Sequence, residues 1–173
     1  KDWMDGDNYK QTRTMPKYTV KSDEVSRWQP TPPLYMDGIE PHWDKIRPFV
    51  LDSAAQFKTK PHPAYDMKTN SAFQKEVMEV YKLGGGGPER TGEEVEIAKF
   101  WDCNPYMSST KGHLMFAVKK ISPGGHWIGI CKIACEKSGA DFAKTVFAYT
   151  KTSVAIFEGF ISCWEEKYSS NLI

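Results

Sequence analysis

The sequence lacks the patterns that identify a membrane span, a nucleotide cradle or a common hydrolase. No apolar run reaches the roughly 18 residues that a membrane-spanning helix needs. No G-x-S-x-G, H-E-x-x-H or G-K-[ST] motif occurs in the 173 residues. Lys and Arg number 23 against 22 Asp and Glu, so the net charge of +1 provides no field to hold a polyanion. These absences argue against a transmembrane helix, a P-loop and a nucleic-acid partner.

Cysteine and histidine are scarce and poorly spaced for a metal centre. There are four of each, with no C-x-x-C pair and no close histidine pair. Cys131 and Cys135 are four residues apart in a predicted helix, a spacing that would need histidines to complete a metal site. Neutral buried cysteines are far more common, so the sequence predicts no metal ion held by its own side chains.

The first 65 residues differ in composition from the rest. Eight of the 11 prolines lie there, which disfavours long helices because proline fixes φ and removes an amide donor. The same stretch contains Trp3, Trp28 and Trp43, which a solvated linker would lack. We therefore expect residues 1–65 to form an irregular arm packed on a helical body of residues 66–173. A short helix over residues 46–58 is also expected, from apolar residues at helical spacing.

Two capping boxes predict helix starts in the body. Ser71 with Gln74 opens a helix that the glycine tract at residues 84–87 ends. Thr91 with Glu94 opens a second, shorter helix that runs to Trp101 and breaks at Asn104-Pro105. The glycine tract follows a helix instead of a strand, so it does not indicate a phosphate-binding loop.

Three further helices are expected. One covers residues 108–121, and a second has Pro123 in its first turn, where the missing amide costs nothing. The third runs over residues 141–167, which contain no proline and a single glycine, Gly159, and would be about 40 Å long. Its apolar residues point in nearly every direction, which is typical of a helix at the centre of a bundle. The predicted fold is all-α: a helical bundle with a long central helix, wrapped by the irregular arm.

Lys167 is the candidate functional residue. It lies near the end of the predicted central helix, and Trp164, three residues earlier, shares its face. A cation leaving an apolar helix indicates an anionic ligand, because a bound oxyanion would stabilise the charge. The alternative is structural, since cations are also favourable near helix C-termini. Glu158 lies on the opposite side of the helix, where we expect a structural pairing with Arg47 or Arg90.

Several motifs together resemble the N-terminal part of bacterial vanadium-dependent haloperoxidase-like proteins, in the superfamily that includes type-2 phosphatidic acid phosphatases and bacterial acid phosphatases. Tyr168 and Lys167 belong to one of these motifs, and the similarity extends from about Trp28 to Ile173. The motifs, in chain order, are Trp28-Gln-Pro-Thr-Pro-Pro-Leu-Tyr35, Glu40-Pro-His-Trp43, Arg47-Pro48-Phe49, Arg90-Thr91, Ile97-Ala98-Lys-Phe-Trp101, Gly125-His-Trp127 and Phe160-Ile-Ser-Cys-Trp164-Glu-Glu-Lys167-Tyr168.

The resemblance implies a site and a missing remainder. The first family signature is a lysine, six residues and Arg-Pro. Lys167 is followed by six residues, 168–173, after which Arg-Pro would come. By resemblance, Lys167 binds oxygens of vanadate or phosphate, Trp164 lines the same pocket, and a histidine and further donors come from the C-terminal remainder of the protein. The isolated chain is then expected to be inactive.

The resemblance leaves the reaction open. In a haloperoxidase the histidine holds vanadate and the lysine polarises peroxide toward halide. In a phosphatase the histidine attacks a phosphomonoester and the lysine stabilises the charged oxygens. An extracytoplasmic location, periplasmic or secreted, is also implied by resemblance, and such bundles tend to form homo-oligomers. The alternative of a different class is a non-catalytic helical module whose aromatic arm binds a partner.

Overall fold

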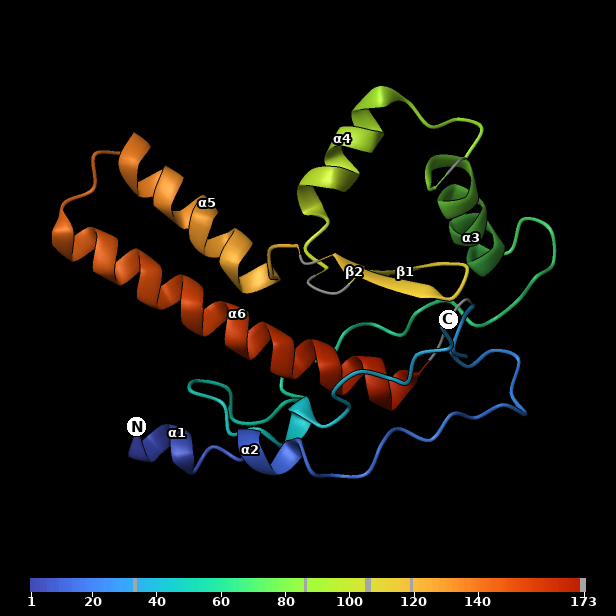
Figure 1. Ribbon diagram of the computed structural model, residues 1–173. Coiled ribbons are helices and arrows are strands. Elements are labelled where there is room, and N and C mark those ends of the chain that lie inside the picture. The colour runs from blue at the N-terminus through green and yellow to red at the C-terminus, as the bar shows by residue number, and fades with distance from the viewer. Residues whose placement is uncertain (33, 86, 105–106, 119, 172–173) are drawn as a thin grey trace. The chain divides into compact units, whose positions relative to one another are not determined.

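The computed structural model describes residues 1–32, 34–85, 87–104, 107–118 and 120–171, and Figure 1 shows its helices and strands. Contacts within the chain group residues 1–59 with 124–173 as one compact unit, and residues 60–123 as another. The two units are described separately below, and the predicted boundary at residues 65 and 66 stays a prediction. Among the described residues, no helix combines the length and the apolar character that crossing a membrane requires.

Helix α6, Phe142–Ser170, dominates the first unit. It begins as predicted, because the Asp141 side chain caps it by accepting a hydrogen bond from the Lys144 amide at 2.8 Å. It ends at Asn171, whose φ of 45° is left-handed, three residues beyond the predicted end. Helix α5, Pro123–Lys137, precedes it and begins at the predicted proline. Figure 1 shows α5 and α6 running in opposite directions as a helical hairpin.

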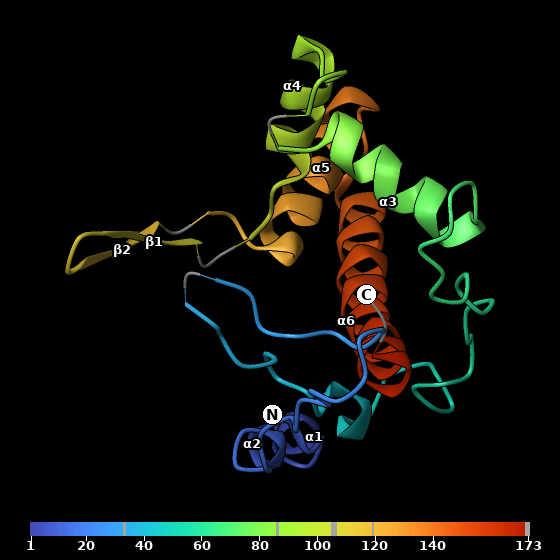
Figure 2. The same cartoon turned by 90° about the vertical axis from the view of Figure 1, so that its right-hand side faces the viewer.

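The predicted irregular arm is present in the same unit. Its helical pieces are short: α1, Asp2–Asp5; α2, Tyr9–Thr12; and the 3₁₀ helix η1, Trp43–Lys45. Both views place η1 beside the C-terminal half of α6 (Figures 1 and 2). The Trp43 ring contacts three aromatic rings of α6, with centroid distances of 5.3 to 6.3 Å, namely Phe157, Phe160 and Trp164.

The core of this unit lies under the arm. Ile46 of the arm is 2% exposed and Ile161 of α6 is fully buried. The helix expected over residues 46–58 is wrong, because this stretch forms turns and extended backbone. Its amides at residues 49–51 bond to a side chain of α6 instead of to carbonyls one helical turn earlier. A tertiary contact has therefore overridden local helical spacing.

Both predicted capping boxes are found in the second unit. The Ser71 hydroxyl accepts a hydrogen bond from the Gln74 amide at 3.0 Å and starts α3, Ala72–Leu83, which ends at Gly84. Thr91 and Glu94 bond reciprocally and start α4, Gly92–Trp101. Gly86 and Pro105, which belong to the predicted breaks after these helices, lie outside the described residues.

A β-hairpin replaces the helix predicted over residues 108–121. Strand β1, Met107–Lys111, pairs antiparallel with β2, Leu114–Val118, and Lys111 lies opposite Leu114. The connection is two residues long, and its first residue, Gly112, has a φ of +62°. Glycine at this position suits a type II′ turn, whose twist matches that of the strands. The all-α class is otherwise confirmed, since helices form nearly all the regular structure that is described.

Helix α6 is only partly covered by the described residues. Glu158 and Ile161 are its buried residues. Toward its N-terminus the apolar side chains of Phe142, Val146 and Phe147 are 86%, 47% and 64% exposed. A helix that is apolar all round and remains this exposed is part of a bundle that this chain supplies only in part.

Candidate functional site

Lys167 and Trp164 are brought together in the last turn of α6. The Lys167 ammonium lies 4.8 Å from the centroid of the Trp164 ring and 5.9 Å from that of Tyr168. Such cation–π contacts stabilise an ammonium without neutralising its charge. The i, i+3 spacing therefore places the two predicted residues on one face of the helix, whereas their role in binding remains a prediction.

The positive charge of Lys167 is not compensated within the described part of the chain. No carboxylate there lies within 4.0 Å of its ammonium, and the side chain is exposed. Neighbouring Glu165 approaches Lys58 instead, at 3.8 Å. The amine is thus available to an anion from outside. Its place near the helix C-terminus also fits the structural alternative, in which the helix dipole stabilises the charge.

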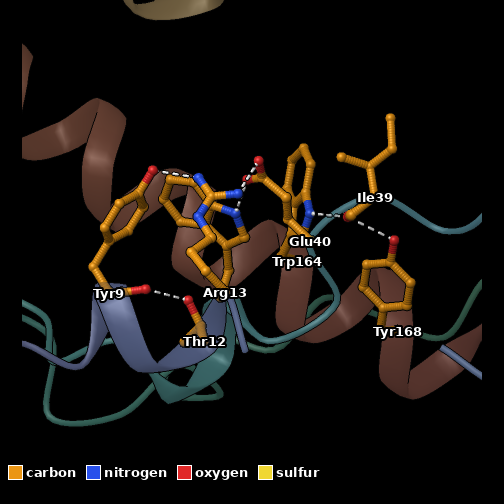
Figure 3. Close-up of polar contacts among 8 residues, drawn as sticks. Tyr9, Thr12, Arg13, Ile39, Glu40, Trp164 and Tyr168 are labelled. Carbon is orange, nitrogen blue, oxygen red and sulfur yellow. Dashed lines mark hydrogen bonds and ion pairs between the residues drawn. The ribbon is translucent and has the colours of Figure 1, made fainter. Parts of the chain in front are cut away.

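A backbone carbonyl of the arm orients the aromatic residues beside Lys167. The Ile39 oxygen accepts hydrogen bonds from Trp164 Nε1 at 3.1 Å and from the Tyr168 hydroxyl at 2.7 Å (Figure 3). Both bonds cross more than 120 residues of sequence. Sequence reasoning missed Ile39, because a carbonyl acceptor leaves no signal in residue type.

The next residue, Glu40, anchors this part of the arm. Its carboxylate accepts a hydrogen bond from Trp43 Nε1 at 2.7 Å and forms an ion pair with Arg13. Arg13 also donates to the Tyr9 hydroxyl and lies over the Tyr9 ring (Figure 3). Glu40 therefore links α2 and η1, and Trp43 continues the contact to the rings of α6.

The environment of Tyr168 predicts a high titration midpoint. Burial raises the pKa of its hydroxyl to about 12, and nearby Tyr18 and Glu40 add to the shift. The raised pKa keeps the hydroxyl protonated as a donor, and its contribution to stability is present below the normal tyrosine pKa of about 10 and is lost as the pH rises toward 12. An alkaline absorbance titration, compared with that of a Tyr168→Phe variant, should show a phenol with a midpoint near 12.

A Tyr18→Phe variant is the matched control for this titration. Its ring contacts that of Tyr168, with centroids 5.1 Å apart. The absorbance lost in the control should not reproduce the late phase. If the difference between the protein and the Tyr168→Phe variant instead titrated near the normal value of about 10, the hydroxyl would not be buried as described.

Glu158 has different partners from those predicted. Its carboxylate accepts hydrogen bonds from three backbone amides of the arm, at 2.5 Å from Phe49, 3.4 Å from Val50 and 2.9 Å from Leu51. Glu158 is 8% exposed. The expected pairing with an arginine is wrong, because irregular backbone offers unpaired amides that a buried carboxylate can satisfy.

The two arginines considered for Glu158 bond elsewhere. Arg47 donates to the Trp3 carbonyl at 2.7 Å and lies over the Trp3 ring. Arg90 donates to the Gly85 carbonyl in the other unit. Neither guanidinium is therefore directed at the candidate site.

Other features of the described residues offer no competing site. No group of three or more His, Cys, Asp or Glu among them is arranged to hold a metal ion. Burial and the neighbouring Cys131 raise the pKa of the Cys135 thiol, which favours its neutral form. A cavity of about 480 Å³ lies along α3 in the unit of residues 60–123, and it contains neither Lys167 nor Trp164.

Comparison with solved structures identifies a similar protein. A crystal structure described as that of the first bacterial vanadium-dependent iodoperoxidase matches 99% of this chain at 60% identity, with a TM-score of 0.84. The resemblance to the vanadium-dependent haloperoxidases is thereby confirmed. The haloperoxidase-like chain spans 40% of the length of the matched protein. No family model and no curated protein matches it.

Proposed function

We propose that this chain is part of a vanadium-dependent haloperoxidase that uses hydrogen peroxide to oxidise iodide, and that Lys167 is one of the residues that bind its vanadate. The single observation that carries the proposal is the uncompensated ammonium of Lys167, held over Trp164 at 4.8 Å. The family motif assigns vanadate binding to this lysine. The choice of iodide is supported by the name of the matched iodoperoxidase.

The chemistry of Lys167 fits an oxyanion. An ammonium offers three donors and no acceptor, so it can bond several oxygens of one anion. Hydrogen bonds from a charged donor to an anion are short and strong. Bound vanadate would supply the activation of peroxide. In this chain, Lys167 would offset negative charge on the anion's oxygens, and the Trp164 ring would restrict the lysine and exclude water from one side.

The remainder of the protein is the proposed partner of this chain. Phe142 and Phe147 of α6 are exposed, and an additional segment would cover them. At the other end of the helix, Glu166 Oε2 and Asn171 Nδ2 are buried without a hydrogen-bond partner among the described residues. Such atoms are rare in complete proteins. We propose that the remainder satisfies them and supplies the histidine and other vanadate donors, in a periplasmic or secreted enzyme.

The test compares the 173-residue chain with a protein extended to the length of the matched relative. We expect vanadate-dependent oxidation of iodide by the extended protein alone. Turnover by the 173-residue chain without another polypeptide would contradict the proposal. Hydrolysis of a phosphomonoester without iodide oxidation would indicate the phosphatase alternative. Failure of both proteins to bind vanadate or phosphate would favour the non-catalytic binding module.

A further inference from the structure

The contacts around Ile39 connect the arm to both aromatic neighbours of Lys167. One carbonyl oxygen accepts from Trp164 Nε1 at 3.1 Å and from the Tyr168 hydroxyl at 2.7 Å. Those two rings are the ones that the Lys167 ammonium approaches. Because each ring is fixed at its polar atom, rotation about its side-chain bonds is restricted, and so is the space that the lysine can occupy.

Residue 38 must be small for this arrangement to form. A Cβ atom on Gly38 would lie 3.0 Å from the Tyr168 hydroxyl oxygen and 3.1 Å from a carbon of the same ring. These separations are shorter than ordinary van der Waals contact, so any side chain at residue 38 would displace Tyr168. The absence of a side chain at Gly38 is what lets the Tyr168 hydroxyl reach the Ile39 carbonyl.

Residue 40 is held in a backbone conformation that its type disfavours. Glu40 has a φ of +52°, in the left-handed region that non-glycine residues rarely occupy. Such residues persist where surrounding contacts fix them, and they cluster at functional sites. Here the fixing contacts are the hydrogen bond from Trp43 and the ion pair with Arg13. The direction of the preceding carbonyl, that of Ile39, is thus fixed by both neighbours.

We infer that residues 38–40 position Lys167 for its anion, by holding Trp164 and Tyr168 through the Ile39 carbonyl. Ile39 is then a positioning residue located about 125 residues before the group it acts on. This inference rests on the proposed function, because it supposes that Lys167 binds vanadate. It adds that the affinity of the site depends on the arm, which has no contact with the anion in the family signature.

The experiment is a double-mutant cycle on vanadate binding to the extended protein without substrate, measured by equilibrium dialysis. The variants are Tyr168→Phe, Lys167→Ala and the two combined. Tyr168→Phe keeps the ring and removes the bond to Ile39. Its vanadate Kd should rise about five-fold, the equivalent of one ordinary hydrogen bond. In the Lys167→Ala background, the same change should alter the Kd by less than about two-fold, because the residue it positions is gone.

Two further variants separate positioning from general stability. Gly38→Ala should raise the Kd to a similar extent by displacing Tyr168, although it alters no donor. Tyr18→Phe is the control, because its ring touches that of Tyr168 and its hydroxyl makes no hydrogen bond among the described residues. It should leave the Kd unchanged. Thermal unfolding of each variant verifies that the fold is retained.

The outcomes distinguish this inference from the proposed function. If Lys167→Ala weakens binding but Tyr168→Phe and Gly38→Ala do not, the positioning role is wrong and the proposed function stands. If Tyr168→Phe weakens binding equally with and without Lys167, its effect is structural and the positioning role is again wrong. If Lys167→Ala leaves vanadate binding unchanged, the proposed function itself is wrong.

Discussion

Replacing Lys167 with alanine should weaken vanadate binding to the extended protein by about 10- to 150-fold, because a hydrogen bond from a charged group contributes about 1.5 to 3 kcal/mol. The ammonium of Lys167 has no carboxylate partner among the described residues, so its removal leaves no unpaired acid behind. The loss should therefore appear in binding and hardly in folding. Equilibrium dialysis gives the Kd, and thermal unfolding gives the stability.

Lys151 provides a matched control on the same helix. Its ammonium also lies over an aromatic ring, 5.4 Å from the centroid of Phe147. Lys151→Ala removes the same charge and the same kind of cation–π contact at a distance of four helical turns. It should leave the vanadate Kd within about two-fold, the change expected from a distant surface charge. Equal loss in both variants would show that net charge, not the site, governs binding.

Replacing Glu158 with glutamine should lower the free energy of unfolding by about 2 to 4 kcal/mol, because it removes a buried charge that several amides solvate. Both carboxylate oxygens accept bonds from the arm, at 2.5 Å from Phe49 and 2.9 Å from Leu51. Glutamine can offer only one oxygen, and its NH₂ group would face an amide N–H. Chemical denaturation followed by circular dichroism measures the change.

Glu165→Gln is the control for this variant. Glu165 lies on the same helix, and its side chain faces Lys58 at the longer distance of 3.8 Å. Loss of such a pair should cost less than about 1 kcal/mol. Limited proteolysis provides a second measurement, since the arm near Leu51 should be cleaved faster only when Glu158 is changed. Equal stability of the two variants would mean that the amides are satisfied as well by water.

The elements that the sequence predicted well are those specified by neighbouring residues. Ser71 with Gln74, and Thr91 with Glu94, determine helix starts within four residues. The pair of Trp164 and Lys167 is likewise local, because helical geometry alone places residues three apart on one face. These features follow from short-range chemistry and do not depend on the rest of the fold.

The elements that the sequence did not predict depend on distant parts of the chain or on a short turn. Glu158 bonds to amides 107 to 109 residues earlier, and Ile39 accepts from residues 125 and 129 positions later. Backbone donors and acceptors are the same in every residue, so such contacts leave no pattern. The hairpin was missed because a two-residue turn at Gly112 resembles a helix break in composition.

The bonds between Glu158 and the arm also have a consequence for synthesis in the cell. The arm leaves the ribosome first, yet the carboxylate that receives the Phe49 amide is translated 109 residues later. At usual elongation rates this interval lasts about 5 to 20 s. During that time Trp3, Phe49 and their aromatic neighbours have no surface to pack on, so the nascent arm is a natural substrate for chaperones that bind exposed aromatic segments.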